Sequence, residues 1–221
     1  MSAGERCYLA GKQHTDVLMF ELNSTPPQII IVDNFYANPL AVRQFALTQT
    51  FVAHEAYHKG KRTETKHLTP ELKAAFEAYL GRPITGWEDY AYNGVFQSCV
   101  AGEQLVYHSD AQSYAATIYL TPNAPASAGL KTLQSKETKI RRDPSPADAA
   151  TASSDLNTLR VRTYGNKLLD YSAWDTVDQI GNVFNRLVIF DAKLIHAAGG
   201  YFGHDLHSGR LFQMFFFDVA R

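Results

Sequence analysis

The sequence predicts an α+β protein that is mostly β, in which helices near the beginning of the chain back a β-sandwich or barrel. Two helix-start signals, Asn38-Pro39 and Thr69-Pro70-Glu71, both fall in the first third of the chain. From Trp87 onward the apolar residues recur with a period of two, and several short β-rich runs follow without the regular strand-helix alternation of a parallel sheet. The length of 221 residues fits one domain, covering residues 1–221.

The bulk composition narrows the function classes. Apolar residues make up 45% of the chain, enough for a sizeable core, and the formal net charge is −1, which gives no overall attraction to nucleic acid or an anionic membrane. Two cysteines, Cys7 and Cys99, are too few for a disulfide framework. The chain starts without an apolar run of signal-peptide length, and no window is long enough to span a membrane. We therefore expect a soluble cytoplasmic protein with no membrane or nucleic-acid partner; the oligomeric state is left open.

The N-terminal elements follow from local signals. A short strand is expected at 17–20, and the continuous β-branched run at 28–32 predicts a strand buried on both faces. Asn38 and Pro39 suit the cap and first position of a helix, and the same pattern at Thr69-Pro70 starts a second helix that Gly81 ends. The segment between the two helices, 54–62, is polar and basic and predicts a loop.

The remaining chain predicts strands, one short helix and a long insert. We expect strands or β-rich segments at 87–99, 104–108, 113–121, 129–134, 185–190 and 210–218, and a helix near 167–177. The segment 136–156, rich in Pro, Ala and Ser, has little to bury and is expected to be a mobile loop. Two interpretations of it are open: a solvated surface excursion, or a lid over a functional site.

The strongest chemical signal is the pair His108 and Asp110. On an extended strand, side chains at i and i+2 point to the same side, so an imidazole nitrogen and a carboxylate oxygen converge. His196, an isolated histidine after the apolar run 187–190 and before small residues, is a candidate third ligand. Two histidines and one carboxylate with open positions suit a non-haem Fe(II) oxygenase. A surface His-x-Asp pair and a core histidine are the alternative readings.

Two further residues are candidates for binding an anion. By alternation Arg210 shares a face with Phe212, Met214 and Phe216, where a guanidinium is costly unless a carboxylate pairs with it. Arginine binds a carboxylate with two parallel hydrogen bonds, and the hydroxyl of Tyr119 could be a second donor. The alternatives are that Arg210 reaches solvent from the first strand position and that Tyr119 is an ordinary core residue.

With these residues in place, the sequence resembles the Fe(II)/2-oxoglutarate-dependent dioxygenases, and most closely their prolyl-4-hydroxylase-like branch. The resemblance spans roughly residues 28–218, with 136–180 least covered. The residues on which the resemblance rests are the strand at 29–33 with the Asn-Phe-Tyr that follows it, His108-Ser109-Asp110, Tyr119-Leu120, Gly129, the segment from Asn185 to His196, and Gly209-Arg210-Leu211.

The resemblance implies a core with the double-stranded β-helix fold, also called a jelly roll. It also implies an iron-dependent hydroxylation. Iron would be bound by His108, Asp110 and His196, and 2-oxoglutarate would be anchored at its far carboxylate by Arg210 and Tyr119. O₂ would be the second cosubstrate, an unactivated C–H of an amino acid, peptidyl residue or small metabolite would be hydroxylated, and succinate and CO₂ would be released. Halogenase relatives carry a small residue in place of the carboxylate, so Asp110 favours hydroxylation.

The sequence also departs from the family pattern and leaves rivals open. The interval between His196 and Arg210 is long, and its His204-Asp205-Leu206-His207 motif resembles a ligand set; we reject it because it lies in a glycine-flanked turn without a rigid strand. A zinc-dependent hydrolase could use the same ligands but lacks a His-Glu-x-x-His helix, and a non-catalytic jelly-roll binding protein would keep the fold without turnover. The basic residues at 59–66 are expected to form a solvated surface.

Overall fold

The computed structural model of the chain describes residues 27–53 and 59–220. The strand expected at 17–20, and Cys7, lie outside these ranges. Within the described residues no helix combines the length and the apolar character that a membrane span requires.

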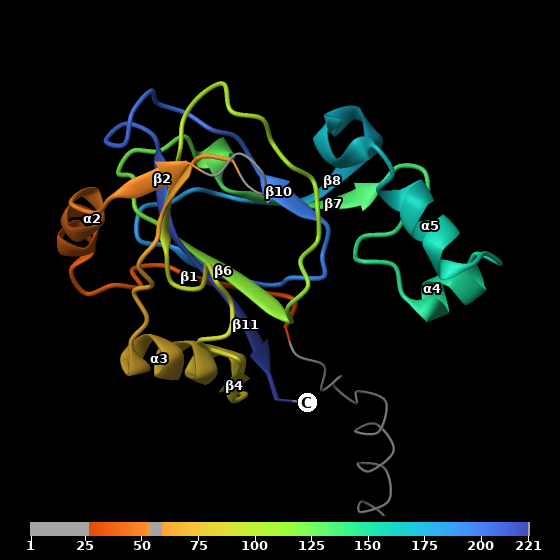
Figure 1. Cartoon of the computed structure of the whole chain (residues 1–221), viewed down its shortest axis with the longest axis horizontal. Coiled ribbons are helices and arrows are strands. Elements are labelled where there is room, and N and C mark those ends of the chain that lie inside the picture. The colour runs from red at the N-terminus through yellow and green to blue at the C-terminus, as the bar shows by residue number, and fades with distance from the viewer. Residues whose placement is uncertain (1–26, 54–58, 221) are drawn as a thin grey trace, which may run out of the picture.

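Two antiparallel sheets form the body of the protein (Figure 1). The larger one has the order β1-β9-β6-β11-β5-β3-β2, with β4 paired to β11 as well. The smaller one has the order β10-β7-β8. The strands of the larger sheet are β1 (Ile29–Val32), β2 (Phe51–Ala53), β3 (Lys61–Thr63), β4 (Ile84–Thr85), β5 (Phe96–Cys99), β6 (Tyr114–Tyr119), β9 (Leu187–Asp191) and β11 (Arg210–Val219). Those of the smaller sheet are β7 (Leu130–Ser135), β8 (Trp174–Ile180) and β10 (His196–Ala198).

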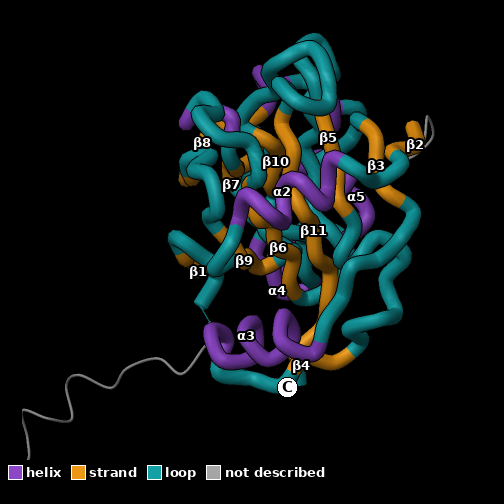
Figure 2. The backbone as a smooth tube through the Cα atoms, turned by 90° about the vertical axis from the view of Figure 1, so that its left-hand side faces the viewer, coloured by secondary structure: helices purple, strands orange, loops and turns teal. Residues whose placement is uncertain are grey.

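Both expected N-terminal helices are present, and each begins as its sequence predicts. In α2 (Pro39–Leu47) the side chain of Asn38 accepts a hydrogen bond from the Ala41 amide, and proline follows the cap. In α3 (Pro70–Leu80) the cap is Thr69. Gly81 ends α3 with a φ of 66°, a left-handed conformation that glycine adopts without strain. Figure 2 shows α3 beside β4 at one end of the larger sheet.

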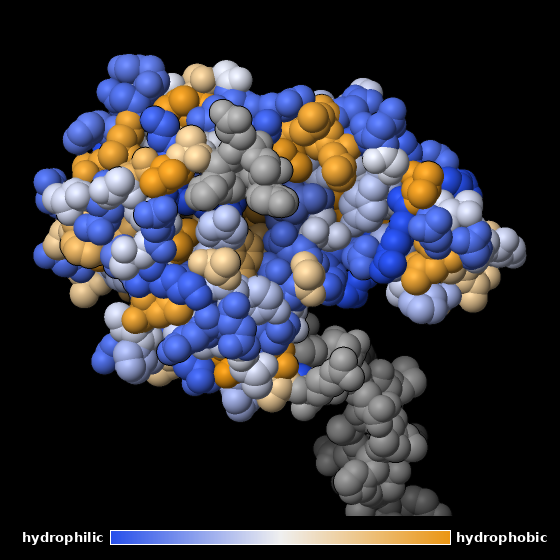
Figure 3. All heavy atoms as spheres, in the orientation of Figure 1, coloured by the Kyte–Doolittle hydropathy of each residue, from blue (hydrophilic) through white to orange (hydrophobic). Residues whose placement is uncertain are grey.

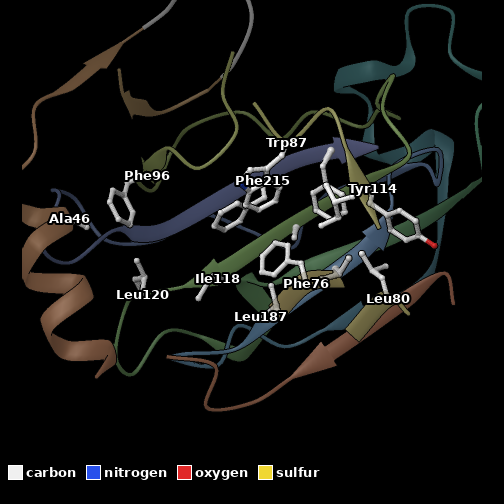
Figure 4. Close-up of a cluster of buried hydrophobic side chains, with 14 of the residues drawn as sticks. Ala46, Phe76, Leu80, Trp87, Phe96, Tyr114, Ile118, Leu120, Leu187 and Phe215 are labelled. Carbon is white, nitrogen blue, oxygen red and sulfur yellow. The ribbon is translucent and has the colours of Figure 1, made fainter. Parts of the chain in front are cut away.

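The outer face of the larger sheet packs against these helices. Phe215 on β11 contacts Phe76 of α3 edge-to-face, with ring centroids 4.9 Å apart, and stacks on Trp87 at 5.9 Å. Figure 4 shows how these rings meet residues of β6 and β9, including Ile118 and Leu187. All of these side chains are buried. Burial of a large aromatic side chain contributes roughly 1.5–3 kcal/mol, so this cluster fixes the helices on the sheet.

The inner face of the same sheet turns toward the smaller sheet and holds the second cluster. Along β11 the alternation places Phe212, Met214 and Phe216 on this side, as expected, with Phe215 on the other. Leu130 of β7 and Ile180 of β8 join the inner cluster from the smaller sheet. A single strand therefore contributes one row of side chains to the helix-backed core and another to the space between the sheets.

Several sequence expectations are wrong in detail. The strand expected to be buried on both faces is the edge strand β1, in which Ile31 is 48% exposed. Residues 104–107 form no strand: His108 makes only an isolated bridge to His196, so the turn after Gly102 leads into an irregular segment. The helix expected near 167–177 is two short 3-10 turns, η2 (Lys167–Leu169) and η3 (Tyr171–Ala173), followed by β8 from Trp174. Strand pairing of β8 with β7 overrides the local helical pattern there.

The insert at 136–156 is also more regular than expected. It contains α4 (Pro146–Thr151), whose Ser145 and Asp148 form a capping box, and it ends where α5 (Leu156–Thr163) begins. The two helices lie against each other beyond β7 and β8 (Figure 1). In Figure 3 the surface of this part is mostly hydrophilic, with small hydrophobic areas. The expectation of a plain loop is thus wrong; the mobility of the insert stays a prediction.

Candidate metal centre and adjoining pocket

His108 and His196 are brought together by backbone pairing between two segments far apart in the sequence. The His108 amide donates to the His196 carbonyl at 3.1 Å, and the His196 amide donates back at 2.7 Å. Two residues that exchange both hydrogen bonds have side chains on the same side of the pair. The imidazole centroids are accordingly only 4.4 Å apart.

Asp110 completes the group from the irregular segment that follows His108. Its amide donates to the Ala192 carbonyl at 2.8 Å, which fixes the backbone beside the turn after β9. The two carboxylate oxygens then face the histidines: Oδ1 lies 3.5 Å from His108 Nε2, and Oδ2 lies 3.5 Å from His196 Nε2. The sequence therefore predicted the meeting of these three residues correctly, although only His196 stands on a strand.

The rings are oriented by their other nitrogens. Nδ1 of His196 lies 2.9 Å from the Leu194 carbonyl, and Nδ1 of His108 lies 3.2 Å from the Val106 carbonyl. A carbonyl only accepts, so Nδ1 carries the proton in each ring and the Nε2 lone pair points to the shared centre. Burial, together with the nearby His108, lowers the pKa of His196 to about 4, so this ring is neutral at physiological pH. A neutral imidazole is the form that binds a metal.

The spacing of the three groups fits one divalent ion. One nitrogen or oxygen from each residue lies within 4.8 Å of the others. Atoms that are each about 2.1 Å from one ion stand roughly 3–4 Å apart, depending on the angle between them. Of the described residues, these three form the sole group of histidine, cysteine and acidic side chains close enough to hold an ion together.

Ser109, between two of the candidate ligands, reaches the end of helix α5. Its Oγ lies 2.6 Å from the hydroxyl of Tyr164, the residue that ends α5. Burial raises the pKa of Tyr164 to about 12, so the hydroxyl keeps its proton and can donate it. The segment that supplies two candidate ligands is thus braced by the end of a helix that the sequence did not predict.

A cavity of about 500 Å³ opens from these three residues between the two sheets. Its lining includes Arg210, Phe212, Met214 and Phe216 from the inner face of β11. Asp110 is the one carboxylate among the lining residues that the structure describes. The cavity is therefore mostly apolar, and its other charged lining residues are lysine and arginine.

Arg210 is buried in the wall of this cavity, not exposed at a strand end. Only 4% of it is accessible to solvent. Its Nε donates to the Ala128 carbonyl at 2.9 Å, and one terminal nitrogen donates to the Gly129 carbonyl at 3.4 Å. The guanidinium also lies 4.2 Å from the centre of the Phe212 ring. No described acidic side chain forms an ion pair with Arg210, so an anion in the cavity could neutralise it.

Tyr119 is the last residue of β6 and lies beside Arg210. The guanidinium stands 5.3 Å from its ring centre. The side chain is completely buried, and the hydroxyl oxygen has no hydrogen-bond partner among the described residues. Burial raises the pKa of this phenol, which keeps it protonated. The hydroxyl is thus a candidate donor for a ligand bound beside Arg210, although Tyr119 is not among the described residues that line the cavity.

The sequence missed a second arginine of the cavity. Arg62, expected on a solvated basic surface, lines the cavity from β3, while its neighbours Lys61 and Lys66 are exposed as expected. The segment 61–63 is a strand and not a loop, so alternation turns Arg62 inward and Lys61 outward. That alternation was the available signal, but three residues are too few to reveal it.

The His204-Asp205-Leu206-His207 motif forms a turn. Asp205 Oδ1 accepts hydrogen bonds from the amides of His207 and Ser208 and from the Ser208 hydroxyl. The His204 side chain is 84% exposed. This carboxylate is occupied in closing the loop, in keeping with the rejection of the motif as a ligand set.

No protein-family model matches the chain, and no curated protein matches it in sequence. Solved structures do match it in shape. The nickel and 2-oxoglutarate complex of HygX from Streptomyces hygroscopicus has a TM-score of 0.51 at 11% identity, and the complex that also contains hygromycin B has 0.50 at 10%. Each match covers 85% of this chain and 81% of HygX. A prolyl hydroxylase from Trichoplax adhaerens, bound to a peptide, scores 0.48 at 15% identity, covering 86% and 84%.

The likeness to HygX establishes a shared fold. It confirms the expected mostly β, jelly-roll-like architecture, and the likeness is one of fold to a protein whose structure was solved with 2-oxoglutarate bound.

Proposed function

We propose that this chain is an Fe(II)- and 2-oxoglutarate-dependent dioxygenase that hydroxylates an unactivated C–H bond of a small molecule or peptidyl residue. The observation that carries the proposal is the pairing of two features in one cavity: three converging metal-ligand groups at one side, and a buried, unpaired guanidinium at another. The HygX structures, which share the fold, contain a divalent metal and 2-oxoglutarate.

In this proposal His108, Asp110 and His196 hold the iron, which supplies oxidative chemistry with O₂ and 2-oxoglutarate when bound. The protein contributes position and shielding. Arg210 binds the far carboxylate of 2-oxoglutarate, and the Tyr119 hydroxyl is a second donor to it. The carbonyls of Ala128 and Gly129 hold the guanidinium in place before the cosubstrate arrives. Apolar side chains of β11 limit the access of water to the cavity.

The test starts with anaerobically purified protein. Fe(II) and 2-oxoglutarate are added, binding of each is measured, and succinate formation is followed after O₂ is admitted, with and without candidate substrates. We expect 2-oxoglutarate binding that depends on the metal, and a basal formation of succinate. Asp110→Ala should abolish both metal binding and succinate formation. An Asp205→Ala control, in the exposed turn, should leave both unchanged.

Each rival gives a different outcome. A jelly-roll binding protein without turnover would bind ligand but release no succinate, and absence of metal and 2-oxoglutarate binding would refute the proposal altogether. A zinc hydrolase needs a general base beside the metal, and the described lining of the cavity offers no carboxylate besides Asp110. Unchanged turnover in Asp110→Ala would refute the assignment of the metal ligands.

A further inference from the structure

Arg62 is a second cation in the cavity that the proposed reaction leaves unused. It stands at the centre of β3, which pairs with β5 at one side of the larger sheet (Figure 2). Its guanidinium lies 4.6 Å from the centre of the Tyr92 ring, and its Nε donates to Gln97 Oε1 at 2.9 Å. The side chain lines the same cavity as the three candidate metal ligands.

The orientation of Arg62 is held by a small network. The Gln97 side chain donates through Nε2 to the Lys59 carbonyl at 2.6 Å, which leaves its Oε1 facing Arg62. Gly60 makes this approach feasible because a Cβ there would collide with the Ser98 carbonyl oxygen. The chain therefore presses β3 against β5 at the point where Gln97 fixes the guanidinium. Such preorganisation is typical of a binding group and unusual for a solvated surface arginine.

The charge of Arg62 has no described partner. Burial lowers its pKa to about 10, with smaller opposing contributions from neighbours that include Asp110, so it stays cationic at neutral pH. Asp110 is the one described carboxylate among those neighbours, and it is committed to the candidate metal centre. Within residues 27–53 and 59–220, the terminal nitrogens of Arg62 donate no hydrogen bond to another residue. Neither nitrogen is among the buried polar atoms that lack a partner. Because the Arg62 side chain lines the cavity, these nitrogens are available to a ligand bound there.

The two arginines differ in a way that separates their roles. Arg210 is buried and donates two hydrogen bonds to backbone carbonyls, whereas Arg62 is partly exposed and, among the described residues, donates a hydrogen bond through Nε alone. Lys59 adds a further positive charge on the side of Arg62, and Met214 and Phe216 provide apolar wall. A planar guanidinium whose two terminal nitrogens have no hydrogen-bond partner among the described residues matches the two oxygens of a carboxylate.

We propose that Arg62 binds the carboxylate of the primary substrate, so that the substrate is a small carboxylic acid with an apolar body. The inference rests on the proposed function, since it assigns 2-oxoglutarate to Arg210 and leaves Arg62 for the molecule to be oxidised. It favours a free acid over an internal residue of a peptide, which carries no carboxylate on its backbone.

The test uses the full chain loaded with Mn(II), which binds like Fe(II) without reacting with O₂, and with saturating 2-oxoglutarate. Benzoate and benzamide, which have similar shapes and differ in charge, are titrated by calorimetry into the parent protein, Arg62→Gln and Lys61→Gln. Lys61 is the matched control because it loses the same charge from the same strand but points away from the cavity. The Mn(II) affinity, measured first, shows that each variant is folded, and the 2-oxoglutarate affinity of each variant is measured before benzoate is added.

We expect benzoate to bind the parent protein and Lys61→Gln equally, and to bind Arg62→Gln at least about tenfold more weakly, as loss of a charge-assisted hydrogen bond predicts. Arg62→Lys should recover part of the affinity, and benzamide should not distinguish the proteins. Three results would overturn the inference: equal binding of benzoate and benzamide to the parent protein, absence of benzoate binding, or unchanged benzoate affinity in Arg62→Gln.

Two outcomes separate this inference from the proposed function. If Arg62→Gln weakens 2-oxoglutarate as much as benzoate, Arg62 is part of the cosubstrate site and the inference fails while the dioxygenase proposal stands. If the parent protein binds neither Mn(II) nor 2-oxoglutarate, the proposed function fails, and the same benzoate comparison on the metal-free protein still decides whether Arg62 binds a carboxylate.

Discussion

Replacing Arg210 by alanine should nearly abolish 2-oxoglutarate binding while leaving the metal centre intact. The guanidinium is buried, and its position is set by carbonyls of the segment before β7, so a carboxylate bound there would be shielded from water. Each hydrogen bond between charged groups contributes about 1.5–3 kcal/mol, so the loss of two costs about 3–6 kcal/mol. At about 1.4 kcal/mol per factor of ten, this cost lowers the affinity roughly 10²- to 10⁴-fold.

The assay is titration of 2-oxoglutarate into Mn(II)-loaded protein, with Mn(II) affinity measured separately. Arg210→Lys is the informative companion, because lysine keeps the charge but cannot make two parallel hydrogen bonds, and it should lie between the parent and Arg210→Ala. Arg141→Ala, at an exposed arginine that pairs with Asp178 on the smaller sheet, is the matched control and should bind 2-oxoglutarate normally.

A decrease of less than tenfold in Arg210→Ala, with Mn(II) binding retained, would refute the assignment of Arg210 to the cosubstrate. Loss of Mn(II) binding together with 2-oxoglutarate binding would instead show that removal of the guanidinium disturbs the fold. In that case the 2-oxoglutarate affinity of Arg210→Lys tests the assignment, because this variant retains the cation beside the Phe212 and Tyr119 rings.

Three other changes probe the core, the acid stability and the metal segment. Phe215→Ala should lower the free energy of unfolding by about 3–5 kcal/mol in urea denaturation because the ring is fully buried, whereas Leu40→Ala, at a 62% exposed position, should change it by less than about 0.5 kcal/mol. Burial raises the pKa of Asp218, but hydrogen bonds from Ser113 and Tyr90 outweigh the effect of burial and hold the pKa below its usual value. The ionised carboxylate therefore stabilises the fold above the unfolded pKa of about 3.9, and this stabilisation is lost as the pH falls through the folded pKa. Asp218→Asn should accordingly lose less stability than the parent protein when the pH is lowered in an acid titration. Tyr164→Phe removes the hydrogen bond to Ser109 and should weaken Mn(II) binding several-fold. Ser109→Ala should give the same effect, and the double variant should show no further loss. Additive losses would show that this hydrogen bond does not act on the segment that contains His108 and Asp110.

The sequence predicted best where a long strand repeats a pattern. Over the ten residues of β11 the alternation is long enough to show which side chains share a face with Arg210. The caps at Asn38 and Thr69 are equally local, since each depends on a single side chain and the amide three residues on. Each of these patterns depends only on residues of a single segment, and the structure confirms the predictions made from them.

Prediction failed where tertiary pairing decides the local structure. The residues before His108 satisfy their backbone through partners elsewhere, such as the hydrogen bond from the Tyr107 amide to the Leu168 carbonyl. Nothing within 104–108 reveals that partner, so a β-rich run looked like a strand. The capping box of α4, formed by Ser145 and Asp148, was visible in the sequence, but the low hydrophobicity around it concealed the helix.

Strand register explains why the candidate site was foreseen in part. A shift of β11 by one residue would turn Phe215 into the cavity and Arg210 into the helix-backed core, so the apolar pattern that builds the core also fixes the guanidinium. Arg62 has no such constraint in its own segment, since β3 is three residues long and its inward turn is set by pairing with β5. Residues of the proposed cosubstrate site are therefore encoded in a core strand, whereas the group that would recognise the substrate lies on a short strand whose orientation only the folded sheet determines.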